Sequence, residues 1–211
     1  MSPRTFVASA FSIMHLGAKP VFIDIDRNTQ NMDPDLIEAA ITPNTKAVMA
    51  IHLAGWPCEM EKIQEICNNH NLFLIEDCAQ AHGAKYNGKS VGSFGDVNAW
   101  SFCQDKIMTT AGEGGMVTTN NKDYWSNVWS FKDHGKNYDT VYNKEHPPGF
   151  RWLHEDHGTN ARMTEIQSAI GRIQLKKLDS WIDQRTHLSN IFNNAFKDLD
   201  GLRIALPPSH I

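Results

Sequence analysis

Residues 46–77 read KAVMAIHLAGWPCEMEKIQEICNNHNLFLIED. The run Lys46–Ile51 is apolar, as a buried strand should be. Residues 59–69 carry apolar side chains at helical spacing, and the run Leu72–Ile75 is apolar again. A strand, a helix and a second strand in this order predict a βαβ unit, in which a crossover helix joins two parallel strands.

The same alternation continues on both sides of this unit. Further strands are expected at Pro20–Ile25, Val97–Phe102 and Gly115–Thr119, and further helices after the Asp33–Pro34 start signal, at 123–131, from Thr164 to Ile182 and from Arg185 to Leu199. Residues 133–158 are rich in Gly, Pro and His and predict a long loop. We therefore expect an α/β fold with a mainly parallel sheet and helices on both faces.

Chemically useful residues follow the ends of these strands. Asp77 and His52 each come after an apolar run, and Lys106 comes just past the strand at 97–102. In parallel sheets, ligands bind beyond the carboxyl ends of the strands. A lysine that forms a Schiff base and an acid that keeps a pyridine nitrogen protonated are what pyridoxal 5'-phosphate (PLP) chemistry requires. Lys106 and Asp77 thus predict a PLP site at this edge.

Composition excludes several classes of protein. The 211 residues carry a net charge of −4, which argues against a general nucleic-acid binder. No apolar run is long enough to span a bilayer, and the first residues lack a signal-peptide pattern. The four cysteines, at 58, 67, 78 and 103, form no CxxC pair. We expect a cytoplasmic protein with reduced thiols, without nucleic-acid or membrane partners and without a bound metal.

Five motifs occur in an order that identifies a resemblance. They are Thr5–Ala8, Gly17–Asp26, Ile75–Ala84, Gly112–Val117 and Gly158–Glu165. Together they resemble the DegT/DnrJ/EryC1/StrS family, whose members are PLP-dependent aminotransferases acting on nucleotide-linked keto-sugars. The resemblance covers nearly the whole chain and implies a large domain of the aspartate-aminotransferase type.

The resemblance also implies roles for individual residues. Lys106 matches the lysine that binds PLP covalently, and Asp77 matches the acid that pairs with the pyridine nitrogen. Gln80 matches a residue beside the ring near its phenolic oxygen, and Ser101 one that binds the phosphate. Phe6 or its neighbours match the segment near the ring face.

The family resemblance further implies a homodimer with the active site between subunits. Asn160 and Arg162 match a segment that reaches the partner's cofactor. The expected substrates are an amino-acid donor and a nucleotide-linked keto-sugar. One branch of the family has histidine in place of the lysine and removes a hydroxyl group, so Lys106 indicates amine transfer.

Two departures from the family pattern concern the ends of the chain. Family members carry a Gly/Ser/Thr turn for the PLP phosphate well before the Thr5–Phe6 motif, and a smaller C-terminal domain after the long helices. We expect residues 1–184 to form the PLP-binding large domain without that turn, and residues 185–211 to form a helix and linker towards the absent small domain.

Several residues allow a second interpretation. His82 either approaches the cofactor or is a buried histidine bonded to backbone, which is the expectation here. Glu113 and its flanking glycines form either a tight turn or an anion cradle. His154 and His157 have metal-like spacing, but in a loop without a carboxylate partner. The alternative function is a catalytically impaired family member that acts as an interaction module.

Overall fold

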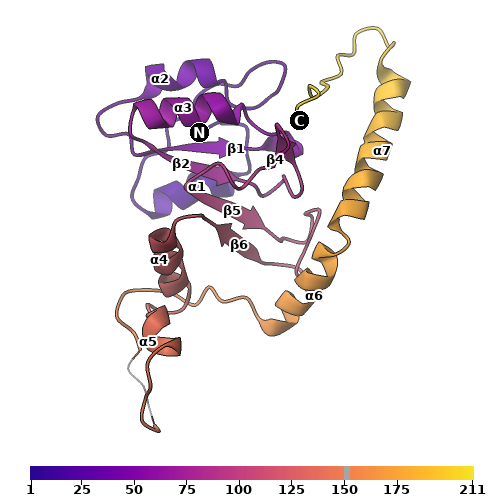
Figure 1. The fold of residues 1–211 in the computed structure, drawn as a ribbon. Coiled ribbons are helices and arrows are strands. Elements are labelled where there is room, and N and C mark those ends of the chain that lie inside the picture. The colour runs from indigo at the N-terminus through magenta and orange to yellow at the C-terminus, as the bar shows by residue number, and fades with distance from the viewer. Residues whose placement is uncertain (150–152) are drawn as a thin grey trace.

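A four-stranded sheet organises the computed structural model, which describes residues 1–149 and 153–211 (Figure 1). Its strands are β1 (Ala47–Ile51), β2 (Phe73–Asp77), β5 (Val97–Ser101) and β6 (Gly115–Thr118), in the order β1-β2-β5-β6. The pairs β1–β2 and β2–β5 are parallel, and β6 is antiparallel to β5. The prediction of a mainly parallel sheet is therefore confirmed.

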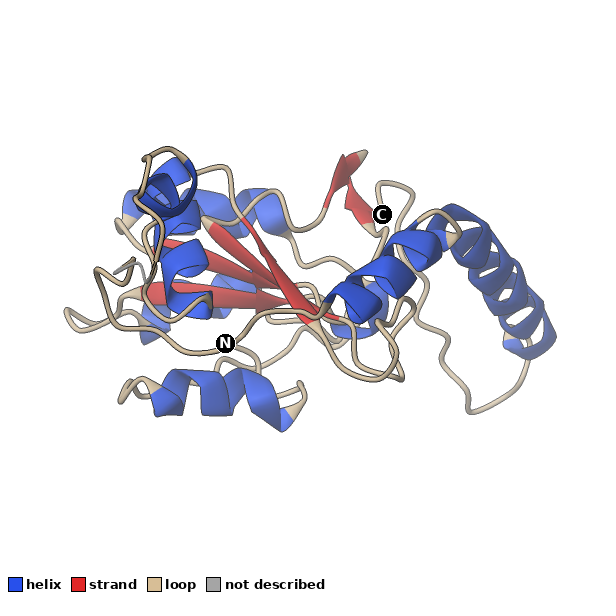
Figure 2. Ribbon diagram, turned by 90° about the horizontal axis from the view of Figure 1, so that it is seen from below, coloured by secondary structure: helices blue, strands red, loops and turns tan. Residues whose placement is uncertain are grey.

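Helices lie on both sides of the strands (Figure 2). They are α1 (Val7–His15), α2 (Ile37–Ala40), α3 (Met60–Asn69), α4 (Lys122–Lys132), α5 (Tyr138–Tyr142), α6 (Glu165–Leu175) and α7 (Leu178–Phe196), with the short 3-10 turns Pro34–Leu36 and Leu53–Gly55. A small antiparallel hairpin, β3 (Lys85–Tyr86) with β4 (Lys89–Ser90), follows β2. This arrangement agrees with the α/β fold expected from the sequence.

The two faces of the sheet differ in burial. Alternate side chains of a strand point to opposite faces. On β2, Leu74 and Glu76 are buried, and they share their face with the core residues Met60 and Ile63 of α3. We call this side the closed face. The side that carries Phe73, Ile75 and Asp77 is exposed or half-buried, and we call it the open face.

The expected strand at Pro20–Ile25 is wrong. This segment has no strand ladder, and only an isolated bridge joins Ile25 to Met32. Its backbone instead bonds to the N-terminal residue, since the Ile23 amide donates to the Met1 carbonyl at 2.9 Å. Val21 is half exposed. The apolar pattern was therefore right for an extended segment, but the segment gains no neighbour in the sheet.

The C-terminal helices also differ from the expectation. Thr164 does begin α6, because its hydroxyl and the Gln167 side chain form a reciprocal capping box. The first helix, however, ends at Leu175, and α7 runs unbroken from Leu178 to Phe196, so the expected break between 182 and 185 is wrong. The division at residues 184 and 185 falls inside α7 and stays a prediction.

Two helices were not expected from the pattern. Helix α1 follows the Thr5–Phe6 motif, and α5 interrupts the predicted loop at 133–158, of which residues 150–152 lie outside the described part.

Helix α7 extends away from the sheet in Figure 1. Its chain then returns to the body, where the Asn87 amide donates to the His210 carbonyl at 2.8 Å. Among the described residues, no helix is long and apolar enough to cross a membrane.

Candidate functional site

The carboxyl ends of β1, β2 and β5 meet at one edge of the sheet. Asp77 is the last residue of β2 and pairs in register with Ala99 of β5. Partners in a parallel ladder point to the same face, and Ser101 lies two residues beyond Ala99 on the same strand. Asp77 and Ser101 therefore share the open face at the strand ends, as the sequence predicted for this edge.

Asp77 is held from two sides. The Ser9 hydroxyl of α1 donates a hydrogen bond of 2.7 Å to Oδ2 of Asp77. The Ala79 amide donates one of 3.1 Å to Oδ1. Each carboxylate oxygen has a second lone pair, so both can accept another donor. The contact with Ser9 was not foreseen, because nothing in the local pattern brings α1 to this strand end.

Lys106 lies in the turn that follows β5. Its amide donates to the Cys103 carbonyl at 3.0 Å. Its side chain is 17% exposed, and the Nζ atom is 3.9 Å from Asp105, which is a loose ion pair. Among the residues that the structure describes, the Ser101 hydroxyl accepts one long contact of 3.4 Å, from the Cys103 amide. The amine and the hydroxyl thus retain donors for a ligand.

Gln80 anchors the segment after β2. Its Oε1 atom accepts a hydrogen bond of 2.6 Å from the Ala54 amide. Ala54 has a positive φ of 54°, so this bond supports a strained turn after β1. Gln80 also lines a cavity of about 310 Å³, together with His82, Ile107 and α7 residues such as Arg185. In the described part of the chain, no hydrogen bond engages the amide nitrogen of Gln80.

His82 is buried. Among the described residues no hydrogen bond of good geometry reaches either ring nitrogen, although the Ser101 carbonyl lies close enough to raise the pKa of the ring, so the expected bond to backbone is at most a weak one. The ring instead lies 5.5 Å from the Trp100 ring and 5.8 Å from the Phe102 ring, centre to centre. Burial lowers the pKa of His82, and the positive charge of Lys106 lowers it further, although the Ser101 carbonyl partly opposes this. His82 is therefore a neutral ring beside the candidate site.

The remaining predicted residues lie apart from these groups. Phe6 precedes α1 and is 70% exposed. Arg162 donates to Asn160 at 3.1 Å and pairs with Asp133 at 3.5 Å, at the end of α4. In the described parts of the chain, no hydrogen bond or ion pair joins Asn160 or Arg162 to the strand-end residues. Their predicted role towards a partner's cofactor stays a prediction.

A buried network occupies the closed face beside the site. Nε2 of His52 donates to Glu76 at 3.0 Å, and Nδ1 accepts from the Cys58 amide at 3.1 Å. Glu76 also accepts from the amides of Gly92, Phe94 and Gly95 at 2.6 to 2.8 Å. Burial alone would raise the pKa of Glu76, but these hydrogen bonds outweigh it and hold the pKa below 4.5.

This network gives His52, which follows the end of β1, a structural role. Ligand atoms of His52, Glu76 and Cys78 lie within 4.8 Å of one another, which is close enough for a metal ion. Both ring nitrogens of His52 are nevertheless used by protein partners. Burial raises the pKa of the Cys78 thiol, so it stays protonated. The cluster is therefore a structural support.

The glycine turn and the loop histidines have local explanations. The Thr110 hydroxyl donates to the Glu113 carbonyl at 2.8 Å, and a side chain at Gly114 would clash with that hydroxyl. The turn interpretation therefore has direct support. Nδ1 of His154 donates to the His134 carbonyl at 2.8 Å, which fixes the loop. Nothing in these contacts supports an anion cradle or a metal pair.

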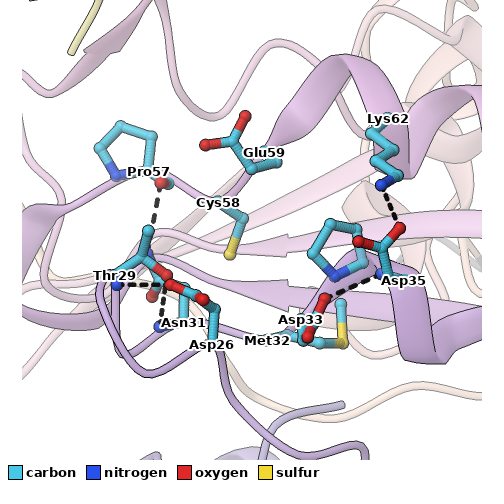
Figure 3. Close-up of a pocket in the computed structure, with 11 residues that line it drawn as sticks. Asp26, Thr29, Asn31, Met32, Asp33, Asp35, Pro57, Cys58, Glu59 and Lys62 are labelled. Atoms are coloured by element: carbon cyan, nitrogen blue, oxygen red, sulfur yellow. Dashed lines mark hydrogen bonds and ion pairs between the residues drawn. The ribbon is translucent and has the colours of Figure 1, made fainter. Parts of the chain in front are cut away.

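A second cavity lies between the segment 26–35 and the residues 57–62, which lead from β1 into α3 (Figure 3). It measures about 350 Å³ and is lined by acidic residues and Lys62. Asp26 accepts from the amides of Asn28 and Thr29, and Asp35 pairs with Lys62. These two carboxylates already have partners within the protein, so the cavity carries no argument for a ligand.

Comparison with known proteins identifies the chain. The profile of the DegT/DnrJ/EryC1/StrS aminotransferase family matches residues 1–210. The chain belongs to this family. The resemblance predicted from the five motifs is confirmed, and the strand-end residues can be considered as a site of that family.

Relatives with assigned names support the family assignment. GDP-perosamine synthase of Escherichia coli O157:H7 is 43% identical over 195 residues, which are 92% of this chain and 50% of the relative. The aminotransferase from Psychrobacter cryohalolentis is 56% identical, with a TM-score of 0.90 over 92% of this chain and 49% of that chain. DesV of S. venezuelae, solved with a ketimine intermediate, is 32% identical with a TM-score of 0.88 over 100% of this chain and 53% of that chain.

These structural neighbours are aminotransferases with the predicted fold of the aspartate-aminotransferase type, also called fold type I. The fold prediction is therefore confirmed. The chain spans about half the length of the curated relatives it matches. Activity, substrates and partners of the whole protein are therefore matters for proposal.

Proposed function

We propose that this family member is a PLP-dependent aminotransferase that transfers an amino group from an amino acid to a nucleotide-linked keto-sugar. The main support is the position of three residues at one edge of the sheet. Asp77 and Ser101 end the neighbouring strands β2 and β5, and Lys106 lies in the turn that follows β5. Relatives named for such reactions, among them GDP-perosamine synthase, support the substrate class. They do not favour the alternative of an interaction module.

The residues present fit PLP. The ligand offers an aldehyde, a pyridine nitrogen, a phenolic oxygen and a phosphate. Lys106 supplies a half-buried amine with only a loose ion pair, and Asp77 supplies a carboxylate with lone pairs to spare. Ser101 and Gln80 add a hydroxyl and an amide nitrogen. The amine, the carboxylate, the hydroxyl and the amide nitrogen match the four polar parts of the ligand.

PLP supplies an electron sink that stabilises negative charge at the substrate carbon. Lys106 would hold PLP covalently and then, once free, move the proton between the substrate carbon and the cofactor carbon. Asp77 would accept from the ring N–H and keep that nitrogen protonated. Gln80 would donate near the phenolic oxygen, and Ser101 would donate to the phosphate.

The proposal includes a homodimer in the cytoplasm. Apolar side chains are exposed along α1 and α7, for example Phe11, Met14 and Phe192. Exposed apolar side chains gathered on a helix often mark a surface that another protein chain covers. Light scattering on the purified protein should therefore give twice the mass of the chain or more. A monomer at micromolar concentration would refute this part of the proposal.

PLP titration tests the core of the proposal. Adding PLP to the pure protein should produce an absorbance band that differs from that of free PLP. Lys106→Ala should abolish the band, because no amine remains to bond with the aldehyde. Lys122→Ala, at an exposed lysine of α4, is the matched control and should keep it. No band at millimolar PLP would overturn cofactor binding by this chain.

A further inference from the structure

Helix α1 buries one residue, and that residue is polar. Ser9 is 7% exposed and is the buried residue of α1, whereas Phe11 and Met14 on the same helix are about half exposed. Burying a hydroxyl is unfavourable unless it is hydrogen-bonded. The packing of α1 is therefore not explained by the hydrophobic effect alone, and the partner of Ser9 is the informative contact.

That partner is Asp77. The Ser9 hydroxyl lies 2.7 Å from Oδ2 of Asp77, across 68 positions of sequence. The Thr5 hydroxyl lies 2.8 Å from the same Ser9 oxygen. Since Ser9 has one proton and gives it to the carboxylate, Thr5 must be the donor in the second bond. The result is a directed chain from Thr5 through Ser9 to Asp77.

The hydrogen bonds from Thr5 through Ser9 fix the direction in which the Asp77 carboxylate faces. The Ala79 amide donates to Oδ1 while Ser9 donates to Oδ2, so rotation of the carboxylate would break a hydrogen bond. Bonds to a charged acceptor are stronger than neutral ones, and consecutive hydroxyls reinforce each other. The remaining lone pairs of Asp77 then keep a constant orientation at the strand end.

We infer that Ser9, backed by Thr5, is a positioning residue that holds the Asp77 carboxylate ready for an N–H donor such as the pyridinium of PLP. This inference rests on the proposed function for the identity of the donor. It goes beyond that function by assigning a role to a helix that carries none of the four groups expected to hold PLP. Thr5 and Ser9 act through Asp77 and touch no reacting atom.

Cofactor affinity provides the first test. Ser9→Ala should weaken PLP binding about tenfold, because the Asp77 carboxylate loses the charge-assisted hydrogen bond that orients it towards the ring N–H. Ser9→Thr keeps a hydroxyl and should restore binding. Ser12→Ala removes another α1 hydroxyl, which donates to the Ser9 carbonyl at 2.9 Å, and should leave binding unchanged.

A double variant separates positioning from general stability. In an Asp77→Asn background, Ser9→Ala should cause little further loss of PLP affinity, since its effect passes through the carboxylate. Equal losses in both backgrounds would overturn the inference. So would a Ser9→Ala protein that is less stable to heat but binds PLP as tightly as the wild type.

A measurement without PLP keeps the inference testable if the proposed function fails. The carboxyl carbon of Asp77 can be followed by NMR in protein labelled with ¹³C-aspartate and identified by its loss in Asp77→Asn. Its resonance should shift in Ser9→Ala and stay in place in Ser12→Ala. An unchanged resonance in Ser9→Ala would overturn the positioning role. Absence of a PLP band in the wild type would instead overturn only the cofactor.

Discussion

The closed and open faces of the sheet use neighbouring acids in opposite ways. Glu76 points into the closed face, where a histidine and three backbone amides satisfy it. Asp77, the next residue, points to the open face, where two donors leave it capacity for a ligand. The period of a strand separates the two carboxylates by one residue. One acid therefore supports the fold, and the other is available for chemistry.

The same contrast holds for apolar residues. Met60, Ile63 and Leu74 are buried in a single cluster on the closed face. Helix α1, which approaches the open face through Ser9, exposes Phe11 and Met14. A binding site needs polar groups that can still form hydrogen bonds and that a ligand can reach. A core needs neither free hydrogen-bonding capacity nor access. Burial, and not residue type, therefore separates the acid that supports the core from the acid proposed to bind the cofactor.

The largest expected effect is on the closed face. Glu76→Ala should lower the free energy of unfolding by about 3–5 kcal/mol, because it leaves His52 and three buried amides without their acceptor. Urea unfolding at neutral pH measures this. On the other side, Ser12→Ala in α1 should change the free energy by less than about 0.5 kcal/mol, because this side chain is exposed. Similar losses in the two variants would remove the distinction between the faces.

The local sequence pattern predicted the strands that pair within the sheet and the helix that packs against them. The βαβ unit at 46–77 was recognisable because both strands lie in the sheet and α3 covers one face. The segment Pro20–Ile25 has the same composition but bonds to Met1, and composition does not specify the partner. The break between α6 and α7 falls at Lys176 and Lys177. The helical spacing of apolar residues continues across these two positions, so the pattern gave no sign of a break.

The candidate site was predictable to a similar degree. Lys106 and Asp77 were found because they follow strands, and strand ends meet by topology. The partners of Glu76 and Asp77 were not found, because they come from the loop at 92–95 and from α1, far away in sequence. Such contacts depend on tertiary packing, for which neither periodicity nor capping gives a signal.

The smallest expected effect concerns pH, where two buried groups should act in separate windows. His82, beside the candidate site, has a pKa lowered from 6.5 by burial and by Lys106. Below pH 6.5 the unfolded chain binds a proton that the folded chain excludes, so stability should fall. Glu76, on the closed face, has a lowered pKa, so its contribution is complete above pH 4.5 and is lost as the pH falls further.

Urea unfolding at pH values from above 6.5 to below 4.5 separates the two windows. His82→Phe should flatten the slope just below pH 6.5, since the ring lies among Trp100 and Phe102 and an apolar ring suits that place. Glu76→Gln should flatten part of the slope below pH 4.5, where Asp26 and Asp133 also contribute through their own lowered pKa values. If His82→Phe left the slope just below pH 6.5 unchanged, His82 would not be the neutral ring that its burial indicates, and the contrast with the well-bonded Glu76 would fail.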